Sequence, residues 1–550
     1  MGRTQRCTWL LVAALACAAG DARAAADQAL SALEAACNAL AGTPNLTITY
    51  TELVSAGREA PQHCYIRGLI SGSIRFHMQL PLPSAWNGRL VNIGDGGKDG
   101  VLNYADSRVA QGYAVANSNS GHDGGAEPLA SFAFNNRQAE IDFGYRAIHL
   151  TATASKTVVN RYYGRNASYS YFEGCSTGGR QGLMEAQRFP YDFNGIIAGA
   201  PVNNYQALNT THVWMLQRVY RNNFAGNLAF DSKGDGSFES LSKVNLLRDA
   251  VLAKCDGKDG IKDGVIDDPL GCDFNPDVDL AGRMCPGDVN ADACLTRAQL
   301  QTIKDAYSGS YDSKGKRILK GKAYGSEFGW ASHFLPHKGN GLFPGTMRTS
   351  PDHVNFLFYE NDPGVSPPDP TNLSYTADRK ANPPEFAWWE FNIDDVTAGK
   401  GNFMMAITDS TDPDLTRFLN KNNGKLILYH GWGDAGSHPE PTLDYYKNVV
   451  ATTFKGDIAA AKKSSRLFMV PGMDHCQGGP GPNAWDKLPA LVEWVENGKA
   501  PDFVVATHSS NGRVDNERPI CAYPQRAMYT GPAGGENNPA NWVASNFTCK

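Results

Sequence analysis

Two short motifs hold residues that can perform nucleophilic catalysis, and each places a cysteine beside its candidate residue. Gly174-Cys175-Ser176-Thr177-Gly178 matches the G-x-S-x-G pattern, in which a tight turn between strand and helix exposes a serine hydroxyl. Far downstream, His475 directly precedes Cys476. A disulfide between Cys175 and Cys476 would make Ser176 and His475 neighbours in space. The two motifs together predict a serine hydrolase with a covalent link next to its catalytic dyad.

A serine nucleophile needs a base, and the base needs a carboxylate that orients it. His475 follows the apolar run 465–470, where the chain order nucleophile, acid, histidine places the base of an α/β hydrolase. Asp434 directly follows the apolar run 424–430 and is the predicted acid. Asp474 is the nearest rival, but its position next to His475 in the sequence is poor for reaching the imidazole ring.

Acyl transfer also requires donors that stabilise an oxyanion. The backbone N–H of Thr177, the residue after the nucleophile, is one predicted donor. The second should come from the loop Gly94-Asp95-Gly96-Gly97, which follows the apolar run 89–93. We expect Asp95 or one of its flanking glycines to supply it.

The elements that must position these residues alternate between strand and helix. Residues 89–93, 113–116, 168–172 and 193–201 read as strands, and 180–188 as a helix. This pattern predicts an α/β fold with a parallel sheet. The segment after about residue 205 is irregular and rich in Gly, Pro, Asp and aromatic residues, before strands resume at 424–430. We therefore predict a catalytic domain formed by 25–204 and 396–550, with an inserted lid domain at 205–395.

The N-terminus has the features of a secretory signal peptide at residues 1–24. Arginines precede the apolar run Trp9–Ala19, and Ala22-Arg23-Ala24 matches a small-x-small cleavage site. A lipoprotein signal ending at Cys17 is a weaker possibility. The run is too short to span a bilayer, and the rest of the chain shows no candidate membrane span. The sequence thus predicts a secreted or periplasmic protein.

Export makes the cysteines candidates for disulfides. Ten of the 12 cysteines lie beyond the predicted signal peptide. Sequence order favours four local bridges and leaves one long-range pair, although spacing alone does not determine connectivity. The predicted pairs are Cys37–Cys64, Cys255–Cys272, Cys285–Cys294, Cys521–Cys549 and Cys175–Cys476. The formal net charge of -5 gives no electrostatic case for nucleic acid as a partner.

A second candidate site lies in the insertion, where aspartates and glycines alternate between residues 256 and 267. Hard oxygen ligands on a tightly turned loop suit Ca²⁺. The segment resembles an EF-hand loop but lacks its twelfth-position glutamate, and a solvated acidic turn would have the same composition. The predicted ligands of a structural calcium ion are the side chains of Asp256, Asp259 and Asp263 and the carbonyls of Ile261 and Val265.

On these motifs the mature chain resembles the tannase and feruloyl esterase family over nearly its whole length. The resemblance rests on residues 174–180, on His430-Gly431-Trp432-Gly433-Asp434 and on residues 471–476. It implies an α/β-hydrolase core with a calcium-binding lid, and the catalytic triad Ser176, Asp434 and His475. It also implies the calcium ligands named above and the same five disulfides.

The resemblance implies a secreted esterase for small esters of aromatic acids, with no obligate protein partner. Feruloyl esterase, tannase and mono(2-hydroxyethyl) terephthalate hydrolase activities all stay open, because specificity lies in the lid. The residues themselves are also compatible with a serine peptidase or with a non-catalytic, calcium-dependent binding protein. The resemblance to the terephthalate enzymes implies a lid arginine that binds the free substrate carboxylate; Arg348 is nearby, but the local sequence diverges, which makes terephthalate activity a less favoured alternative. Aromatic candidates for the pocket wall are Trp330, Phe334, Phe343, Phe356, Phe358, Tyr359, Trp388 and Trp389.

Overall fold

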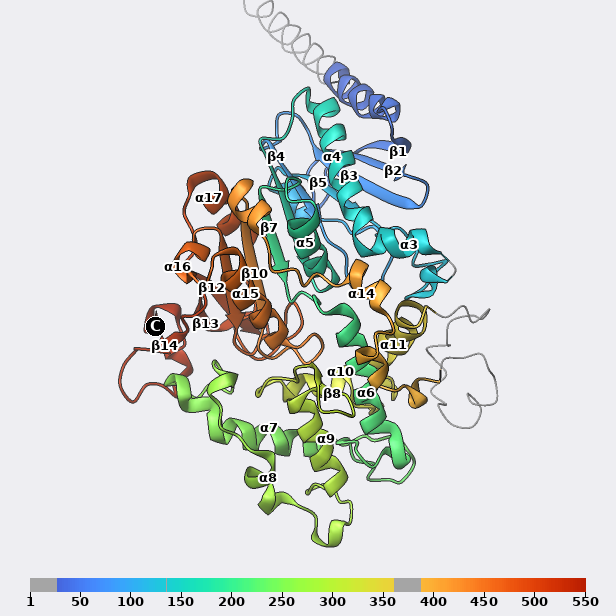
Figure 1. The fold of residues 1–550 in the computed structure, drawn as a ribbon. Coiled ribbons are helices and arrows are strands. Elements are labelled where there is room, and N and C mark those ends of the chain that lie inside the picture. The colour runs from blue at the N-terminus through green and yellow to red at the C-terminus, as the bar shows by residue number, and fades with distance from the viewer. Residues whose placement is uncertain (1–26, 135, 361–386) are drawn as a thin grey trace, which may run out of the picture. The chain divides into compact units, whose positions relative to one another are not determined.

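The computed structural model describes residues 27–134, 136–360 and 387–550, which fold into two compact units (Figure 1). The first unit contains residues 27–92 with Leu102–Ser118 and Leu150–Ser170. The second contains Ile93–Val101, Asn119–His149 and Tyr171–Lys550. The predicted signal peptide, residues 1–24, lies outside the described residues. The predicted boundaries of the catalytic and lid domains stay a prediction.

The first unit is built on a run of mostly antiparallel strands. Its order is β1-β2-β3-β5-β4, in which only β4 and β5 pair in parallel among the described pairings. The sequence pattern did not predict the antiparallel strands β1 to β3. Their bounds are β1 (Thr47–Val54), β2 (His63–Ile70), β3 (Ile74–Pro81), β4 (Arg89–Ile93) and β5 (Ala114–Ser118).

The second unit contains parallel strands in the order β6-β7-β10-β11. They are β6 (Tyr169–Cys175), β7 (Gly195–Gly199), β10 (Lys425–Gly431) and β11 (Ser465–Val470), close to the ranges expected from the sequence. Every residue of β7 is buried, which explains its uninterrupted run of small and apolar residues. Helices α5 (Thr177–Arg188), α15 (Pro439–Thr453) and α17 (Leu488–Asn497) accompany these strands.

Residues 205–395 lie between β7 and β10 in the sequence and are mainly helical where they are described. In Figure 1 their helices, drawn in green and yellow, gather at one end of the parallel strands of the same unit. Buried aromatic and aliphatic side chains from these helices form a large hydrophobic core. The helices and strands are α6 (Tyr205–Phe224), α7 (Ser242–Cys255), α8 (Pro276–Asp279), α9 (Arg297–Ser308), β8 (Ser310–Tyr311), β9 (Arg317–Leu319), α10 (Trp330–His333), α11 (Gly345–His353) and α13 (Asp394–Thr397).

The C-terminal segment adds two antiparallel hairpins to the second unit. Strand β12 (Phe503–Ser510) pairs with β13 (Arg513–Cys521), and β14 (Ala527–Tyr529) pairs with β15 (Phe547–Cys549). Further α-helices are α2 (Asp106–Ala110), α3 (Arg137–Ile141), α4 (Ala147–Tyr163), α14 (Asn402–Thr408) and α16 (Ile458–Ala461). Among the described residues, none of the helices is both long and apolar enough to span a membrane.

Candidate active site

Ser176 occupies the tight turn between β6 and α5 that the G-x-S-x-G pattern predicts. Its φ of 63° and ψ of -122° are rare for a residue with a side chain. Glycine is required on either side, because a Cβ on Gly174 would lie 2.6 Å from the carbonyl carbon of Gly178. The Ser176 N–H donates to the Gly199 carbonyl at 3.0 Å, which ties the turn to the end of β7. The turn therefore presents the hydroxyl at the N-terminus of a helix.

Asp434 and His475 follow neighbouring parallel strands and meet at the carboxyl end of the sheet. The Nδ1 atom of His475 lies 2.6 Å from Oδ2 of the fully buried Asp434. This bond leaves Nε2 of the imidazole as the nitrogen that can accept a proton from a nucleophile. The rival carboxylate, Asp474, accepts instead from the backbone N–H of His475 at 2.8 Å and contacts His333 at 3.3 Å. The geometry therefore favours Asp434 as the partner of the ring.

The carboxylate of Asp434 is surrounded by donors that were not predicted from the sequence. Its Oδ1 accepts from the backbone N–H groups of Gly436 and Ser437, each at 2.8 Å. Its Oδ2 accepts from the Ser437 hydroxyl at 2.5 Å and from Nε2 of His430 at 3.1 Å. The repeated hydrogen bonds stabilise the ionised form of a carboxylate that has no contact with solvent. The one feature of the sequence that could have indicated these donors is that His430, Gly436 and Ser437 lie within four residues of Asp434.

Opposing effects determine the pKa values of this pair. Burial by itself lowers the pKa of His475, but the negative charge of Asp434 and its hydrogen bond outweigh burial and raise this pKa above its ordinary value. Burial likewise raises the pKa of Asp434, but interactions with His475 and His430 outweigh it and hold this pKa well below its ordinary value. The carboxylate is thus ionised at neutral pH, as the orienting acid of a triad must be.

A disulfide joins the two segments that bear Ser176 and His475. Cys175 and Cys476 are bonded with their Cα atoms 6.0 Å apart, although they are separated by 301 residues in the sequence. The described residues contain five disulfides in all, with the pairs that sequence order favoured. The long-range bridge limits how far the end of β6 can separate from the loop after β11.

Ser176, Thr177 and His475 line one cavity of about 300 Å³. Its wall includes the apolar side chains of Val202 and Leu208. The other lining residues are Gly97, Lys98, Tyr205, Asn209, His212, His333, Gly345, Thr346, Thr349, Gly436 and Ser437. A cavity of this size is at the small end of ligand pockets and can hold a single aromatic ring.

The loop after β4 reaches the cavity, but Asp95 is a poor oxyanion donor. Its backbone N–H already donates to Oε1 of Gln181 at 2.9 Å, and its side chain accepts from the Ser120 hydroxyl. Gly97, by contrast, lines the cavity directly. Within this loop the structure therefore favours Gly97, rather than Asp95 or either of the glycines that flank Asp95. Thr177 is the first residue of α5, and an N–H in this position has no acceptor within the helix.

Comparisons with known proteins show the family to which the chain is related. The model of the family described as tannase and feruloyl esterase matches residues 67–549. The chain is 32% identical to mono(2-hydroxyethyl) terephthalate hydrolase of Piscinibacter sakaiensis, over 88% of this chain and 85% of that protein. It is 30% identical to feruloyl esterase B of Aspergillus niger, over 87% of this chain and 86% of that protein. The crystal structure of feruloyl esterase B from Aspergillus oryzae aligns with a TM-score of 0.76 and 25% identity, covering 94% of this chain and 100% of that chain.

The chain belongs to the tannase and feruloyl esterase family. This membership confirms the prediction of a carboxylic ester hydrolase. It also confirms the predicted α/β-hydrolase fold, whose parallel strands β6, β7, β10 and β11 place the candidate triad at their carboxyl ends.

The aromatic residues predicted to line the pocket belong instead to the hydrophobic interior. Trp330, Phe334 and Trp388 are each 1% exposed or less. Of the other candidates, Phe343 and Phe358 are buried in the same core, Tyr359 and Trp389 pack against it, and Phe356 lies in a second core. Arg348 is exposed and contacts the Phe343 carbonyl, and it is absent from the cavity wall. Large apolar rings gain more free energy from full burial than from exposure at a cavity.

The aspartate loop at 256–267 packs against β13. The buried guanidinium of Arg518 contacts Oδ2 of Asp263 at 2.6 Å and Oδ2 of Asp259 at 3.4 Å, and it also pairs with Asp267. Neither Arg518 nor Asp267 was predicted from the sequence to belong to this cluster. Buried Asp256 Oδ1 and Asp267 Oδ2 find no hydrogen-bond partner in the described part of the chain.

Proposed function

We propose that this protein is a secreted serine esterase that hydrolyses small esters of aromatic carboxylic acids. The observation that carries the proposal is that His475, which contacts the buried Asp434 at 2.6 Å, lines the same cavity as Ser176. In this proposal Ser176 is the nucleophile, His475 is the general base and Asp434 orients the imidazole.

The reaction follows from the positions of these groups. His475 takes the hydroxyl proton of Ser176 as the oxygen attacks the ester carbonyl, and the Thr177 N–H with a glycine N–H of the 94–97 loop stabilises the oxyanion. His475 then gives the proton to the departing alcohol, which leaves an acyl-enzyme. Water, deprotonated by the same imidazole, attacks the acyl group and releases the acid and Ser176.

The relatives support aromatic esters as the substrate class, since the names of those reported above are feruloyl esterase B and mono(2-hydroxyethyl) terephthalate hydrolase. Feruloyl esterase activity is the first candidate. One observation favours a terephthalate monoester as the second: Lys98 lines the cavity, is 7% exposed, and donates to the Thr349 carbonyl at 3.2 Å. A lysine in this wall could pair with a free carboxylate on the far side of a substrate ring.

The test is a side-by-side assay of methyl ferulate, methyl gallate and mono(2-hydroxyethyl) terephthalate, with Ser176→Ala as the blank. We expect turnover of at least one ester by the wild type and none above background by Ser176→Ala, with unchanged thermal unfolding. Ester turnover by a correctly folded Ser176→Ala variant would refute the catalytic assignment. The ester with the highest kcat/KM distinguishes the three activities.

We also propose that the loop at 256–267 holds a structural calcium ion. The donor set fits a cation, because the loop holds four carboxylates and the described ion pairs of this cluster involve one guanidinium, that of Arg518. The four carboxylates belong to Asp256, Asp259, Asp263 and Asp267. The unpartnered buried oxygens and the hard oxygen chemistry suit Ca²⁺. Carbonyls of Ile261 and Val265 would complete the site, and the ion would stabilise the loop without entering the reaction. Chelation by EGTA should lower Tm, and Ca²⁺ but not Mg²⁺ should restore it; an unchanged Tm would argue against the site.

Secretion is the third part of the proposal. The described residues contain five disulfides, which form and persist in oxidising compartments. Mass spectrometry of the exported protein should find an N-terminus close to residue 25, and an unprocessed N-terminus would contradict the predicted signal peptide.

A further inference from the structure

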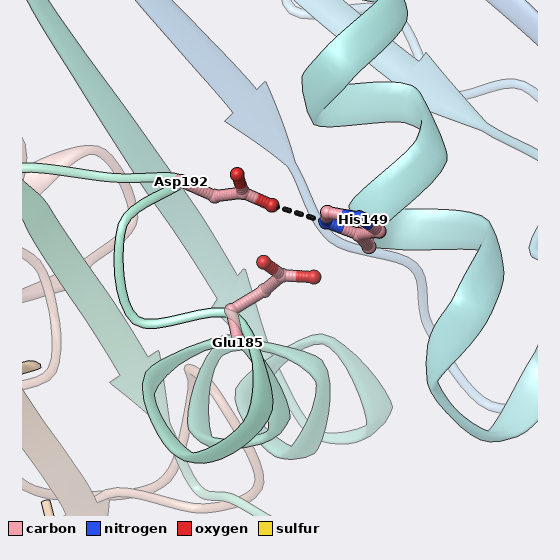
Figure 2. A group of neighbouring side chains, drawn as sticks. All are labelled: His149, Glu185 and Asp192. Atoms are coloured by element: carbon pink, nitrogen blue, oxygen red, sulfur yellow. Dashed lines mark hydrogen bonds and ion pairs between the residues drawn. The ribbon is translucent and has the colours of Figure 1, made fainter. Parts of the chain in front are cut away.

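A cluster of one histidine and two carboxylates lies on α5 and the elements next to it (Figure 2). Nδ1 of His149 lies 2.5 Å from Oδ2 of Asp192, and the carboxylate of Glu185 points toward this pair. One potential ligand atom from each residue lies within 4.8 Å of the others. No residue of this cluster lines the cavity of Ser176.

The surrounding structure holds these three side chains in place. The His149 ring stacks on the ring of Phe189, with centroids 3.9 Å apart and an angle of 7° between the planes. Phe189 ends α5 by donating its N–H to the Glu185 carbonyl at 2.9 Å, and the next turn returns the chain through an Asp192 N–H bond to the Phe189 carbonyl at 3.0 Å. The cluster is thus organised without a ligand, which lowers the entropic cost of binding one.

The burial of the three side chains and the identity of their ligand atoms suit a metal ion. Glu185 is only 1% exposed, whereas the His149 side chain is 32% exposed, so one side of the cluster is enclosed and the other is open to solvent. The potential ligand atoms are an imidazole nitrogen and carboxylate oxygens, which are atoms that transition-metal ions bind in proteins. The enclosed side would hold the protein ligands, and the open side would let a metal ion enter from solvent.

We propose that His149, Glu185 and Asp192 form a binding site for a divalent transition-metal ion, for which Zn²⁺ is the natural probe. An imidazole nitrogen with two carboxylate oxygens is a ligand set that Zn²⁺ accepts, whereas Ca²⁺ and Mg²⁺ prefer oxygen ligands throughout. Nδ1 of His149 would exchange its bond to Asp192 for a bond to the metal. Solvent would complete the coordination on the open side.

Within the second unit, the site would connect the segment that ends at His149 with α5 and the turn after α5. Ser176 caps the N-terminus of α5 and Glu185 lies nine positions later on the same helix, about 13 Å along its axis. Such an ion is too remote to touch the ester, so its role would be to stabilise the helix that presents the nucleophile. Zinc bound here should therefore raise Tm and leave hydrolysis nearly unchanged.

The experiment measures zinc binding to the full-length mature protein by isothermal titration calorimetry in calcium-saturated buffer. His149→Gln and Asp192→Asn remove one ligand each and are expected to fold, because both side chains reach solvent. We expect the wild type to bind one zinc equivalent that both variants bind about tenfold or more weakly. Both variants should also lose the zinc-dependent rise in Tm. Ester hydrolysis without zinc reports whether each variant is folded.

The matched control is His508→Gln, because His508 forms a histidine–aspartate pair of similar length, 2.6 Å, with Asp515. This variant should bind zinc as the wild type does. Co²⁺ offers a second readout, since its visible absorption should change with His149 and not with His508. The proposal is overturned if the wild type binds no zinc, if His149→Gln and Asp192→Asn bind it as tightly as the wild type, or if His508→Gln weakens binding equally.

Discussion

Replacing Asp434 by asparagine tests the proposed triad most directly. Oδ2 of Asp434 accepts from His475, Ser437 and His430, whereas Oδ1 accepts two backbone N–H groups. Asparagine keeps an oxygen for the backbone donors but places an NH₂ group where the other three donors point. Nδ1 of His475 then accepts instead of donating, and the imidazole carries its proton on Nε2, facing the nucleophile. The base can no longer take the proton of Ser176.

The expected loss in kcat is about ten-thousand-fold, the size seen when a triad histidine is held in the wrong tautomer. This corresponds to about 5.4 kcal/mol of lost transition-state stabilisation. KM should change little, since Asp434 has no contact with the cavity. The assay is steady-state hydrolysis of the preferred ester, with the Ser176→Ala rate subtracted.

The pH profile should shift in a defined direction. Activity needs neutral His475, and the charge of Asp434 raises the pKa of this histidine, so the wild type should lose activity as pH falls through a pKa above the ordinary value for histidine. Without that charge, burial lowers the pKa, and the residual activity of Asp434→Asn should persist to lower pH. Asp474→Asn is the matched control and should cost less than about tenfold, because its carboxylate contacts the backbone of His475. Equal losses in the two variants would refute the reasoning.

Three further predictions concern the surroundings of the triad. Replacing Cys175 and Cys476 together by alanine should lower the free energy of unfolding by an amount on the order of 4–5 kcal/mol and should reduce kcat. Thermal unfolding and ester assays measure the two effects, and unchanged values would show that the bridge is dispensable. Gly178→Ala should lower both Tm and kcat, because its Cβ would lie 2.9 Å from the Asp95 carbonyl oxygen, whereas Gly57→Ala has open space and should change neither. Lys98→Met should lower kcat/KM at least tenfold for mono(2-hydroxyethyl) terephthalate but not for methyl ferulate, and an equal effect on both esters would exclude a carboxylate-binding role.

The sequence by itself determined the features that depend on neighbouring residues. Glycines around Ser176 are needed for one tight turn, and the apolar runs before Asp434 and His475 are buried strands close to the predicted bounds. Parallel strands end at the same edge of a sheet, so residues that follow them are brought together whatever their separation in the chain. The candidate triad could therefore be predicted without knowing how residues 205–395 fold.

The tertiary structure decided what depends on the packing of distant segments. Only the fold shows that the Asp95 amide is engaged by Gln181, and that Arg518 reaches the aspartate loop from β13. The prediction that aromatic residues line the cavity was wrong for the same reason. The residue type of Trp330 or Trp388 does not say which surface will cover the ring. Local patterns encode strands and turns because side-chain alternation and the backbone preferences of glycine depend on neighbouring residues. The partners of Asp95 and Arg518 lie 86 and 255 residues away in the sequence. Such pairs form when folding buries both residues together, so the sequence around either residue does not reveal them.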